Sequence, residues 1–341
     1  MAEQRIIGKS PSWVEALDHV SQLAPINRTA LIIGERGTGK ELIAERLHFL
    51  SPRWDQPFIK INCAAYTDSL LESELFGYEP GAFTGANRLH RGHFERAQDG
   101  TLFLDELGTL GDRVQEKVLR VIEYGEFERL GGQKTLQVDV RIAAATNADL
   151  QAMAAAGKFR HDLLDRLAFD VVHLPPLRRR REDIADLSEY FAVRMCHELG
   201  WELFPGFARE AMDVLLDYSW PGNVRELKNV VERSVYRWGN PQEPIERIIV
   251  DPFAADVEGA AESAGGVEGK GREGEHQAIA APTQAAGPID FEQAVKNFEV
   301  QLLQKTLQRC QHHQGETAKQ LGLTYNQFRG LYRKYRLNAP Q

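Results

Sequence analysis

Apolar and polar residues alternate along the first half of the chain in a pattern typical of a mixed helix and strand domain. Short apolar runs bounded by turn residues have the length of buried strands, and amphipathic stretches separate them. Strands and helices that alternate in this way form a parallel sheet wrapped by helices. The pattern therefore predicts an α/β domain over residues 1–174. Its expected strands are residues 30–33, 58–62, 101–106, 140–147 and 171–174.

A helix is expected before the first strand, within residues 1–28. Ser12 is placed to cap it, because a serine oxygen can accept a hydrogen bond from the free amide groups of a first helical turn. The residues expected on the apolar face of this helix are Val14, Leu17, Val20, Leu23 and Ala24.

The strand pattern stops at Pro175, and from there apolar residues recur at helical spacing as far as residue 252. We therefore expect a small helical subdomain over residues 175–252. Its helices are expected near residues 183–194, 208–218 and 224–238.

Residues 253–288 have a different composition and predict a flexible linker. Of the 35 residues from 254 to 288, 17 are Ala or Gly and none is aromatic. Residues 289–341 follow as a separate helical module, with eight Lys or Arg against four Asp or Glu. The whole chain has a net charge of −8, so any contact with nucleic acid has to come from a local basic patch such as this module.

The cysteines and the hydropathy indicate the cellular compartment of the protein. Cys63, Cys196 and Cys310 lie far apart and match neither a zinc spacing nor a disulfide framework, which suits a reducing cytoplasm. No apolar run reaches the roughly 18 residues of a membrane span, and no signal peptide is indicated. We expect a cytoplasmic protein.

A glycine-rich turn follows the first predicted strand, and an amphipathic helix follows the turn. Strand, glycine loop, lysine and helix form the arrangement of a phosphate-binding P-loop. The loop amides, the helix N-terminus and the lysine would hold nucleotide phosphates. A glutamate stands where P-loops usually have Ser or Thr, so an ordinary glycine turn is the alternative. The residues are Gly34, Glu35, Arg36, Gly37, Thr38, Gly39, Lys40 and Glu41.

Polar residues end three of the predicted strands. Asp105 and Glu106 end the third, where Asp105 would hold Mg²⁺ and Glu106 would act as the general base on the attacking water. The alternative is a pair of solvated acids. Thr146 and Asn147 end the fourth strand, where they would reach the γ-phosphate or cap a turn. Asn62, at the end of the second strand, would hydrogen-bond Glu106.

Two arginines, Arg160 and Arg166, lie six residues apart among apolar residues. Either would stabilise developing charge on the γ-phosphate of a neighbouring subunit, an effect worth about 10³–10⁵ in rate. The alternative is a pair of surface salt bridges to Asp162 and Asp165.

The segment from Trp220 to Asn223 predicts a turn, with Asn223 as the cap of the next helix. Arg225 lies in the first turn of that helix, where the helix dipole disfavours a cation. A phosphate partner would explain its position.

Residues 81–86 match, residue for residue, the GAFTGA loop of a known family. Motifs at 75–77, 103–106, 145–147, 159–160, 165–167 and 220–223 also resemble that family in the same order. Over residues 6–250 the chain is similar to the AAA+ activators of sigma-54 RNA polymerase, the bacterial enhancer-binding proteins. A P-loop that ends in glutamate fits this family. The loop residues are Gly81, Ala82, Phe83, Thr84, Gly85 and Ala86.

The resemblance implies an AAA+ ATPase with a helical lid, and ATP and Mg²⁺ as cofactors. It implies hexameric rings, with dimers in the inactive state, and contact between the 81–86 loop and sigma-54. The function would be ATP-driven remodelling of the sigma-54 RNA polymerase holoenzyme from upstream enhancer DNA. Small residues leave Phe83 as the only large apolar side chain of the loop. A hairpin with Phe83 in the core is what the residues alone would favour.

The C-terminal module predicts a DNA-binding helix-turn-helix. A first helix carries an apolar stripe from Phe291 to Leu302 that suits dimerisation, and further helices are expected at 316–321 and 325–335. A merely solvated basic helix is the alternative. The residues expected to contact DNA are Gln327, Arg329, Arg333 and Lys334.

Two rival functions are a replication initiator or helicase loader, and a repressor that only binds nucleotide. The first does not explain the 81–86 loop, and Glu106 with the two candidate arginine fingers argues against the second. Within the family, the short members that respond to phage shock are the most similar, since no sensor domain is expected before Ser12. They imply an inhibitory regulator of the phage-shock protein A type. Trp54, in a turn between helix and strand, is a candidate contact for it. The alternative is a tryptophan packed on its own domain.

Overall fold

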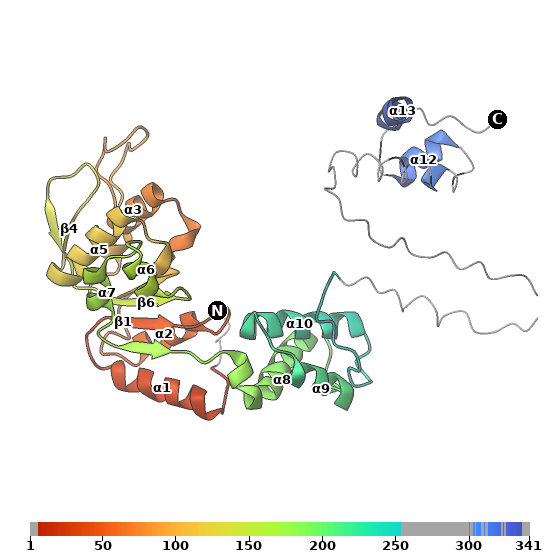
Figure 1. The fold of residues 1–341 in the computed structure, drawn as a ribbon, viewed down its shortest axis with the longest axis horizontal. Helices are drawn as coiled ribbons and strands as arrows, with labels where there is room; N and C mark the ends of the chain where they lie inside the picture. The colour runs from red at the N-terminus through yellow and green to blue at the C-terminus, as the bar shows by residue number, and fades with distance from the viewer. Residues whose placement is uncertain are drawn as a thin grey trace, which may run out of the picture. The chain divides into compact units, whose positions relative to one another are not determined.

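The computed structural model describes residues 6–253 and, nearer the C-terminus, residues 300, 303, 305–307, 310, 313–321, 323 and 325–335. They belong to two compact units, residues 1–260 and 261–341. Figure 1 shows the first unit as a sheet flanked by helices, with a group of further helices beside it.

The sheet is parallel, as predicted. Its strands are β1 (Ala30–Ile33), β2 (Phe58–Asn62), β3 (Thr101–Asp105), β6 (Arg141–Thr146) and β7 (Val171–His173), in the order β2-β3-β6-β1-β7. Because all run the same way, their carboxyl ends meet at one edge: Thr146 lies opposite Ile33, and Asp105 opposite Asn62. The segments that follow the strands, including the P-loop after β1, are thereby brought together.

Helices cover both faces of the sheet (Figure 1). α1 (Pro11–Leu23) and α2 (Lys40–Phe49) bury one apolar cluster with the sheet. A second cluster lies on the other face, under α3, α5 and the short helices near them. Their bounds are α3 (Asp68–Phe76), α4 (His93–Arg96), α5 (Asp112–Tyr124), α6 (Leu150–Ala155) and α7 (His161–Leu167). A short antiparallel pair, β4 (Glu126–Glu128) and β5 (Thr135–Gln137), follows α5 and was not predicted.

The helical lid has its own core, centred on the fully buried Trp220. Its helices are α8 (Arg181–Glu198), α9 (Arg209–Asp217) and α10 (Asn223–Trp238), close to the predicted positions.

The predicted cap of the first helix is wrong. α1 begins at Pro11, with Ser10 before it, because the fixed φ of proline suits a first helical position. Ser12 therefore lies inside the helix, and among the described residues its hydroxyl has no hydrogen-bond partner. Val14, predicted on the apolar face, is exposed, whereas Trp13 is buried.

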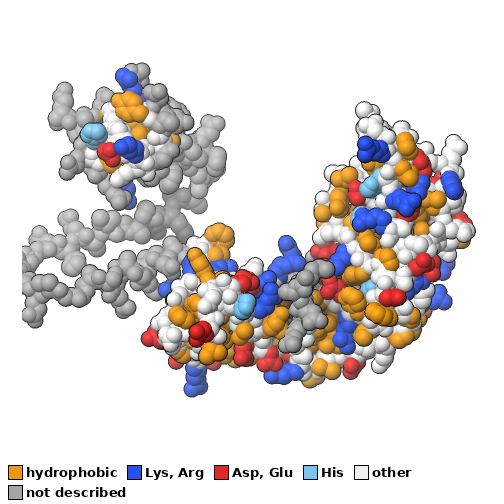
Figure 2. Space-filling view, turned by 180° about the vertical axis from the view of Figure 1, so that it is seen from behind, with side chains coloured by type: hydrophobic (Ala, Val, Ile, Leu, Met, Phe, Trp, Pro, Cys, Tyr) orange, Lys and Arg blue, Asp and Glu red, His pale blue; other side chains and the backbone are white. Residues whose placement is uncertain are grey.

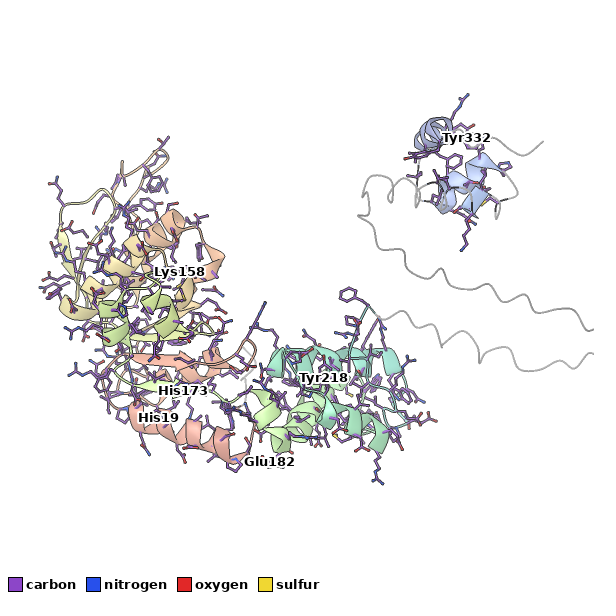
Figure 3. All side chains as sticks on the ribbon, viewed as in Figure 1. His19, Lys158, His173, Glu182, Tyr218 and Tyr332 are labelled. Carbon is purple, nitrogen blue, oxygen red and sulfur yellow. The ribbon has the colours of Figure 1, made fainter. Side chains whose placement is uncertain are left out.

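The C-terminal unit contains the two predicted helices of the helix-turn-helix, α12 (Gln314–Gln320) and α13 (Tyr325–Lys334). Phe328 of α13 is fully buried beside Ala318 of α12, and Tyr332, labelled in Figure 3, packs against the same cluster. The predicted stripe residues Phe291, Ala294, Val295, Phe298 and Leu302 lie outside the described residues, as does the predicted linker from residue 254.

Within the described residues, no helix combines the length and the hydropathy that crossing a bilayer requires. On the face of the first unit seen in Figure 2, acidic and basic side chains are interspersed.

Candidate nucleotide site and the exposed 81–86 loop

The P-loop has the backbone that its glycines predict. Gly37 and Gly39 have φ values of +81° and +99°, in the left-handed region that glycine adopts without penalty. Thr38 stabilises the curl, because its hydroxyl donates to the Glu35 carbonyl oxygen over 2.8 Å. The loop then leads directly into α2, whose N-terminus favours a bound anion.

Lys40 lies at the start of α2 with its ammonium group drawn into the loop. Nζ donates to the carbonyl oxygens of Gly34 and Glu35 over 3.0 and 3.3 Å. Burial lowers the pKa of Lys40, although the carboxylates of Glu106 and Asp105 oppose that shift. The lysine is thus held as a partly desolvated cation beside two acids.

The P-loop is clamped to the lid by polar contacts. Arg178 donates to both carboxylate oxygens of Glu35, over 2.7 and 2.5 Å. The Asn223 side-chain amide donates to Glu35 and to the Arg36 carbonyl oxygen over 3.1 and 3.0 Å, while its oxygen accepts from Leu177 N over 2.8 Å. These partners lower the pKa of Glu35 to about 2, the Arg178 hydrogen bond first. The predicted role of Asn223 as a helix cap is wrong, because its side chain is used between the lid and the loop.

One cavity, of about 320 Å³, lies between the P-loop, the end of β3 and the lid. It brings together the cations and the carboxylates that the sequence predicts for nucleotide binding. Trp13 and Arg180 add a stacked pair to its wall, with the guanidinium carbon 3.7 Å from the ring centre. The predicted site residues that line it are Arg36, Gly37, Thr38, Gly39, Lys40, Glu41, Asp105, Glu106 and Arg225.

The two carboxylates at the end of β3 have distinct environments. Asp105 accepts a hydrogen bond from the backbone amide of Glu106 over 2.9 Å. Glu106 has φ +53°, a left-handed conformation that costs a non-glycine residue about 1–3 kcal/mol. Such strain recurs at functional sites, where a side chain has to be aimed rather than packed.

Other predicted ligands have partners of their own. Asn62 accepts from the Ala64 amide over 2.9 Å, and no hydrogen bond joins it to Glu106 within the described part of the chain, so that contact stays a prediction. Thr146 is fully buried, and its hydroxyl accepts from Ala148 N over 3.0 Å, the turn-cap alternative. Asn147 beside it is exposed and stays a candidate.

Glu41, the residue at the unusual last position of the P-loop, pairs with Lys60 of β2 over 2.9 Å. Its carboxylate is therefore bound to the neighbouring strand, although the residue also lines the cavity.

The 81–86 loop closes on itself. Gly81 N donates to the Ala86 carbonyl oxygen over 2.7 Å, and Ala86 N to the Phe83 carbonyl oxygen over 3.0 Å. Phe83 is 47% exposed, and its ring meets the edge of Tyr78 at a centroid distance of 4.9 Å. The alternative of a hairpin with Phe83 in the core is therefore excluded.

Comparison with known proteins follows the same division of the chain. Residues 6–173 match the family described as Sigma-54 interaction domain, residues 178–247 the AAA+ ATPase lid domain, and residues 294–335 the bacterial regulatory protein, Fis family. The chain is 55% identical over 341 residues to the Psp operon transcriptional activator of Escherichia coli K12, covering 99% of this chain and 100% of that protein. The chain belongs to the sigma-54-dependent AAA+ transcriptional activators. It is therefore an ATPase and a DNA-binding activator.

Longer proteins are similar to this chain over part of their own length. A Nif-specific regulatory protein of Azospirillum brasilense is 51% identical over 229 residues, which is 67% of this chain but only 36% of that protein. The crystal structure of NtrX from Brucella abortus in complex with ATP matches with a TM-score of 0.68 and 31% identity, covering 98% of this chain and 69% of NtrX. A second NtrX structure is a complex with ADP. These likenesses support nucleotide binding by this sigma-54 activator.

The two candidate arginine fingers of this activator are at the surface, at the ends of α7. Arg160 precedes the helix and pairs with Asp162 over 2.7 Å. Arg166 pairs with Glu123 of α5 over 2.9 Å, not with the Asp165 of the salt-bridge alternative. Exposed ion pairs of this kind are worth about 0–1 kcal/mol, so both guanidinium groups can exchange partners at little cost.

A cationic groove of about 730 Å³ beside the 81–86 loop was missed from the sequence. Arg113, Lys117 and Arg120 of α5 line it, together with Phe83. In the sequence, it was indicated only by three basic residues at helical spacing, and the helix to which they belong was not predicted.

The remaining candidates belong to the C-terminal unit and to the turn after α2. Arg329 is exposed on α13, while the side chains of Gln327, Arg333 and Lys334 are not among those described. Trp54 is 63% exposed, which confirms its predicted exposure and excludes the alternative of a packed tryptophan.

Proposed function

We propose that this activator binds enhancer DNA upstream of phage-shock genes and remodels the sigma-54 holoenzyme for open-complex formation by hydrolysing ATP in the cytoplasm. The observation that carries the proposal is the shared cavity of Lys40, Asp105, Glu106 and Arg225. Those groups supply a phosphate cradle, a metal ligand, a base and a lid cation. The similarity to the Psp operon activator over its whole length supports the choice of target genes.

Mg²⁺ is part of the proposal. The ion commonly takes one or two protein carboxylates and completes its shell with phosphate oxygens and water. Asp105 would be the ligand, since Glu41 replaces the usual hydroxyl and is paired with Lys60. When bound, the ion would neutralise charge on the β- and γ-phosphates. Glu106 would then take the proton of the attacking water.

Assembly into a hexameric ring, with dimers as the inactive form, would complete the site. Arg160 and Arg166 are exposed and weakly paired, which supports a role at the γ-phosphate of a neighbouring subunit. The exposed Phe83 and Thr84 of the 81–86 loop would contact sigma-54. Arg329, with Gln327, Arg333 and Lys334, would contact DNA.

An inhibitory regulator similar to phage-shock protein A would bind the surface around Trp54. Phe49 and Leu50, at the end of α2, are also exposed, so three apolar side chains lie close in sequence at one turn. Exposed aromatic anchors are typical of binding hot spots. Trp54→Ala should abolish inhibition by this regulator. Tyr236→Ala, which changes an equally exposed aromatic residue on the lid, is the matched control.

The test of the proposed function is reconstitution with the full chain, sigma-54 holoenzyme and phage-shock promoter DNA. Phosphate release and open complexes are both measured. We expect open complexes only with hydrolysable ATP and only with sigma-54, not with the principal sigma factor. Open complexes without hydrolysis would contradict the remodelling role, and ATP turnover that yields no open complexes with the sigma-54 holoenzyme would favour a replication initiator.

A further inference from the structure

Gln115 of α5 is a fully buried polar residue with no part in the site so far. It is 0% exposed, on the apolar face of a helix that otherwise buries Val114, Val118 and Leu119. Burying an amide side chain costs free energy unless its donor and acceptor groups are all paired. The position of such a residue therefore depends on its hydrogen bonds.

Among the described residues, the side-chain hydrogen bonds of Gln115 all go to backbone atoms, at Leu110 and on either side of Phe159. Nε2 donates to the carbonyl oxygens of Leu110 and Lys158 over 2.7 and 3.3 Å. Oε1 accepts from the backbone amide of Arg160 over 2.8 Å. Lys158, labelled in Figure 3, and Arg160 flank the buried Phe159 just before α7. One amide side chain thus fixes the backbone from which the Arg160 side chain projects.

The other end of the same bridge leads to the catalytic segment. Leu110 ends the short turn that begins at Glu106, where Thr109 N donates to the Glu106 carbonyl oxygen over 3.0 Å. Gln115 therefore joins the segment after the candidate base to the segment that carries a candidate arginine finger. Arg166, in contrast, is supported by Glu123 in an exposed ion pair, which is worth little.

We propose that Gln115 is a positioning residue for Arg160: it sets where a subunit presents this finger to the nucleotide of its neighbour. The inference rests on the proposed role of Arg160 in the ring. The inference adds that losing Gln115 impairs ATP hydrolysis at the adjacent subunit's site. It does not impair the nucleotide site of the subunit that has the substitution. Displacing a catalytic group by about 1 Å can lower a rate by about 10².

The first test is Gln115→Leu, which keeps much of the volume and removes all three hydrogen bonds. We expect kcat for ATP hydrolysis to fall by about 10²-fold, with the Kd for a fluorescent ATP analogue unchanged. Gln115→Met is the second variant, in case the branched leucine does not fold. Thr101→Val is the matched control, since it removes one buried hydrogen bond, to His48, at the far end of β3. It should lower the melting temperature while kcat is kept.

Mixed rings decide where the effect acts. A Gln115→Leu subunit keeps its own base, and a Glu106→Ala subunit keeps its own finger, so mixing two slow proteins should restore turnover. The Arg160→Ala and Glu106→Ala mixture is run beside it. If that reference mixture recovers and the Gln115→Leu mixture does not, the inference is overturned while the finger assignment stands. If neither recovers although mixed assembly is confirmed, the proposed role of Arg160 fails and the inference with it.

Discussion

The P-loop and the 81–86 loop are both glycine-rich turns, yet the structure surrounds them in opposite ways. A Cβ added at Gly37 would lie 2.2 Å from the Gly222 carbonyl oxygen of the lid. A Cβ added at Gly81 or Gly85 would have no atom within 4 Å, although both residues also have positive φ. The first loop is enclosed by another subdomain, and the second turns outward.

This difference separates two uses of glycine. At Gly37 the missing side chain permits a close backbone approach between loop and lid, so the phosphate cradle is held in one shape. At Gly81 and Gly85 it permits only a backbone conformation, in a loop that presents Phe83 to solvent. The enclosed loop suits binding and catalysis, and the open loop suits contact with another protein.

The largest expected effect on ATP hydrolysis comes from removing the candidate general base of the enclosed site. Glu106→Ala should lower kcat by roughly 10²–10⁴-fold, because a positioned base contributes about that much. ATP binding should persist, since the P-loop and Lys40 are intact. Lys40→Ala should instead lose binding itself. Isothermal titration with ATP measures binding, and a phosphate-release assay measures turnover, so together they separate the two variants. Normal turnover by Glu106→Ala would remove the assignment of Glu106 as the base.

The glycines themselves give the next largest effect and the most direct test of the comparison. Gly37→Ala forces the P-loop away from Gly222, so hydrolysis should fall by about 10²-fold, as for a displaced catalytic group. Gly85→Ala carries the same positive-φ penalty, about 1–2 kcal/mol, but meets no neighbour. Its ATPase rate should stay within about threefold of the wild type. Equal losses in both variants would show that enclosure by the lid is irrelevant.

The same contrast explains how much could be predicted from sequence. The bounds of β1 and β2 were predicted correctly, because short apolar runs between turn residues have few other solutions. The contacts of Asn223 with the P-loop and of Gln115 with Arg160 were not predicted. The partners of Asn223 there lie 187 and 188 residues away along the chain, and Arg160 lies 45 residues from Gln115. Asn223 was predicted to be a helix cap, because asparagine is a preferred residue at that position. The one sequence feature of Gln115, a polar residue on an apolar helix face, could not be used because α5 itself was not predicted.

A smaller effect is expected from the clamp between the lid and the P-loop. Asn223→Gly keeps the positive φ of +53° and removes the side chain that binds Leu177 N and the Arg36 carbonyl oxygen. An unpaired buried group costs about 1–3 kcal/mol, so KM for ATP should rise by about tenfold. The readout is steady-state kinetics.

Arg178→Gln is the matched control for that clamp, because it breaks a half-exposed ion pair with Glu35 and should matter less. The pKa of Glu35 is lowered from 4.5 to about 2, so its stabilising contribution is complete above about pH 4.5 and is lost as the pH falls toward 2. The difference in KM for ATP between Asn223→Gly and Arg178→Gln should therefore stay constant between pH 6 and pH 8. A larger rise in KM for ATP in Arg178→Gln than in Asn223→Gly would mean that the ion pair, and not Asn223, holds the lid to the P-loop.

The smallest effect on ATP hydrolysis is expected from substitutions in the 81–86 loop. The same substitutions should abolish activation of transcription. Neither Phe83 nor Thr84 lines the nucleotide cavity, and neither offers a group to the chemistry there. Phe83→Ala and Thr84→Ala should therefore hydrolyse ATP within about threefold of the wild type, yet form no open complexes with sigma-54. Thr84→Ser should recover some activation if the hydroxyl makes the contact. Leu89→Ala is the matched control, since Leu89 is as exposed as Phe83 and lies just beyond the loop. A parallel loss of ATPase activity and activation in the Phe83 variant would mean that its packing on Tyr78 supports the fold, and that the loop is a structural element instead of a contact.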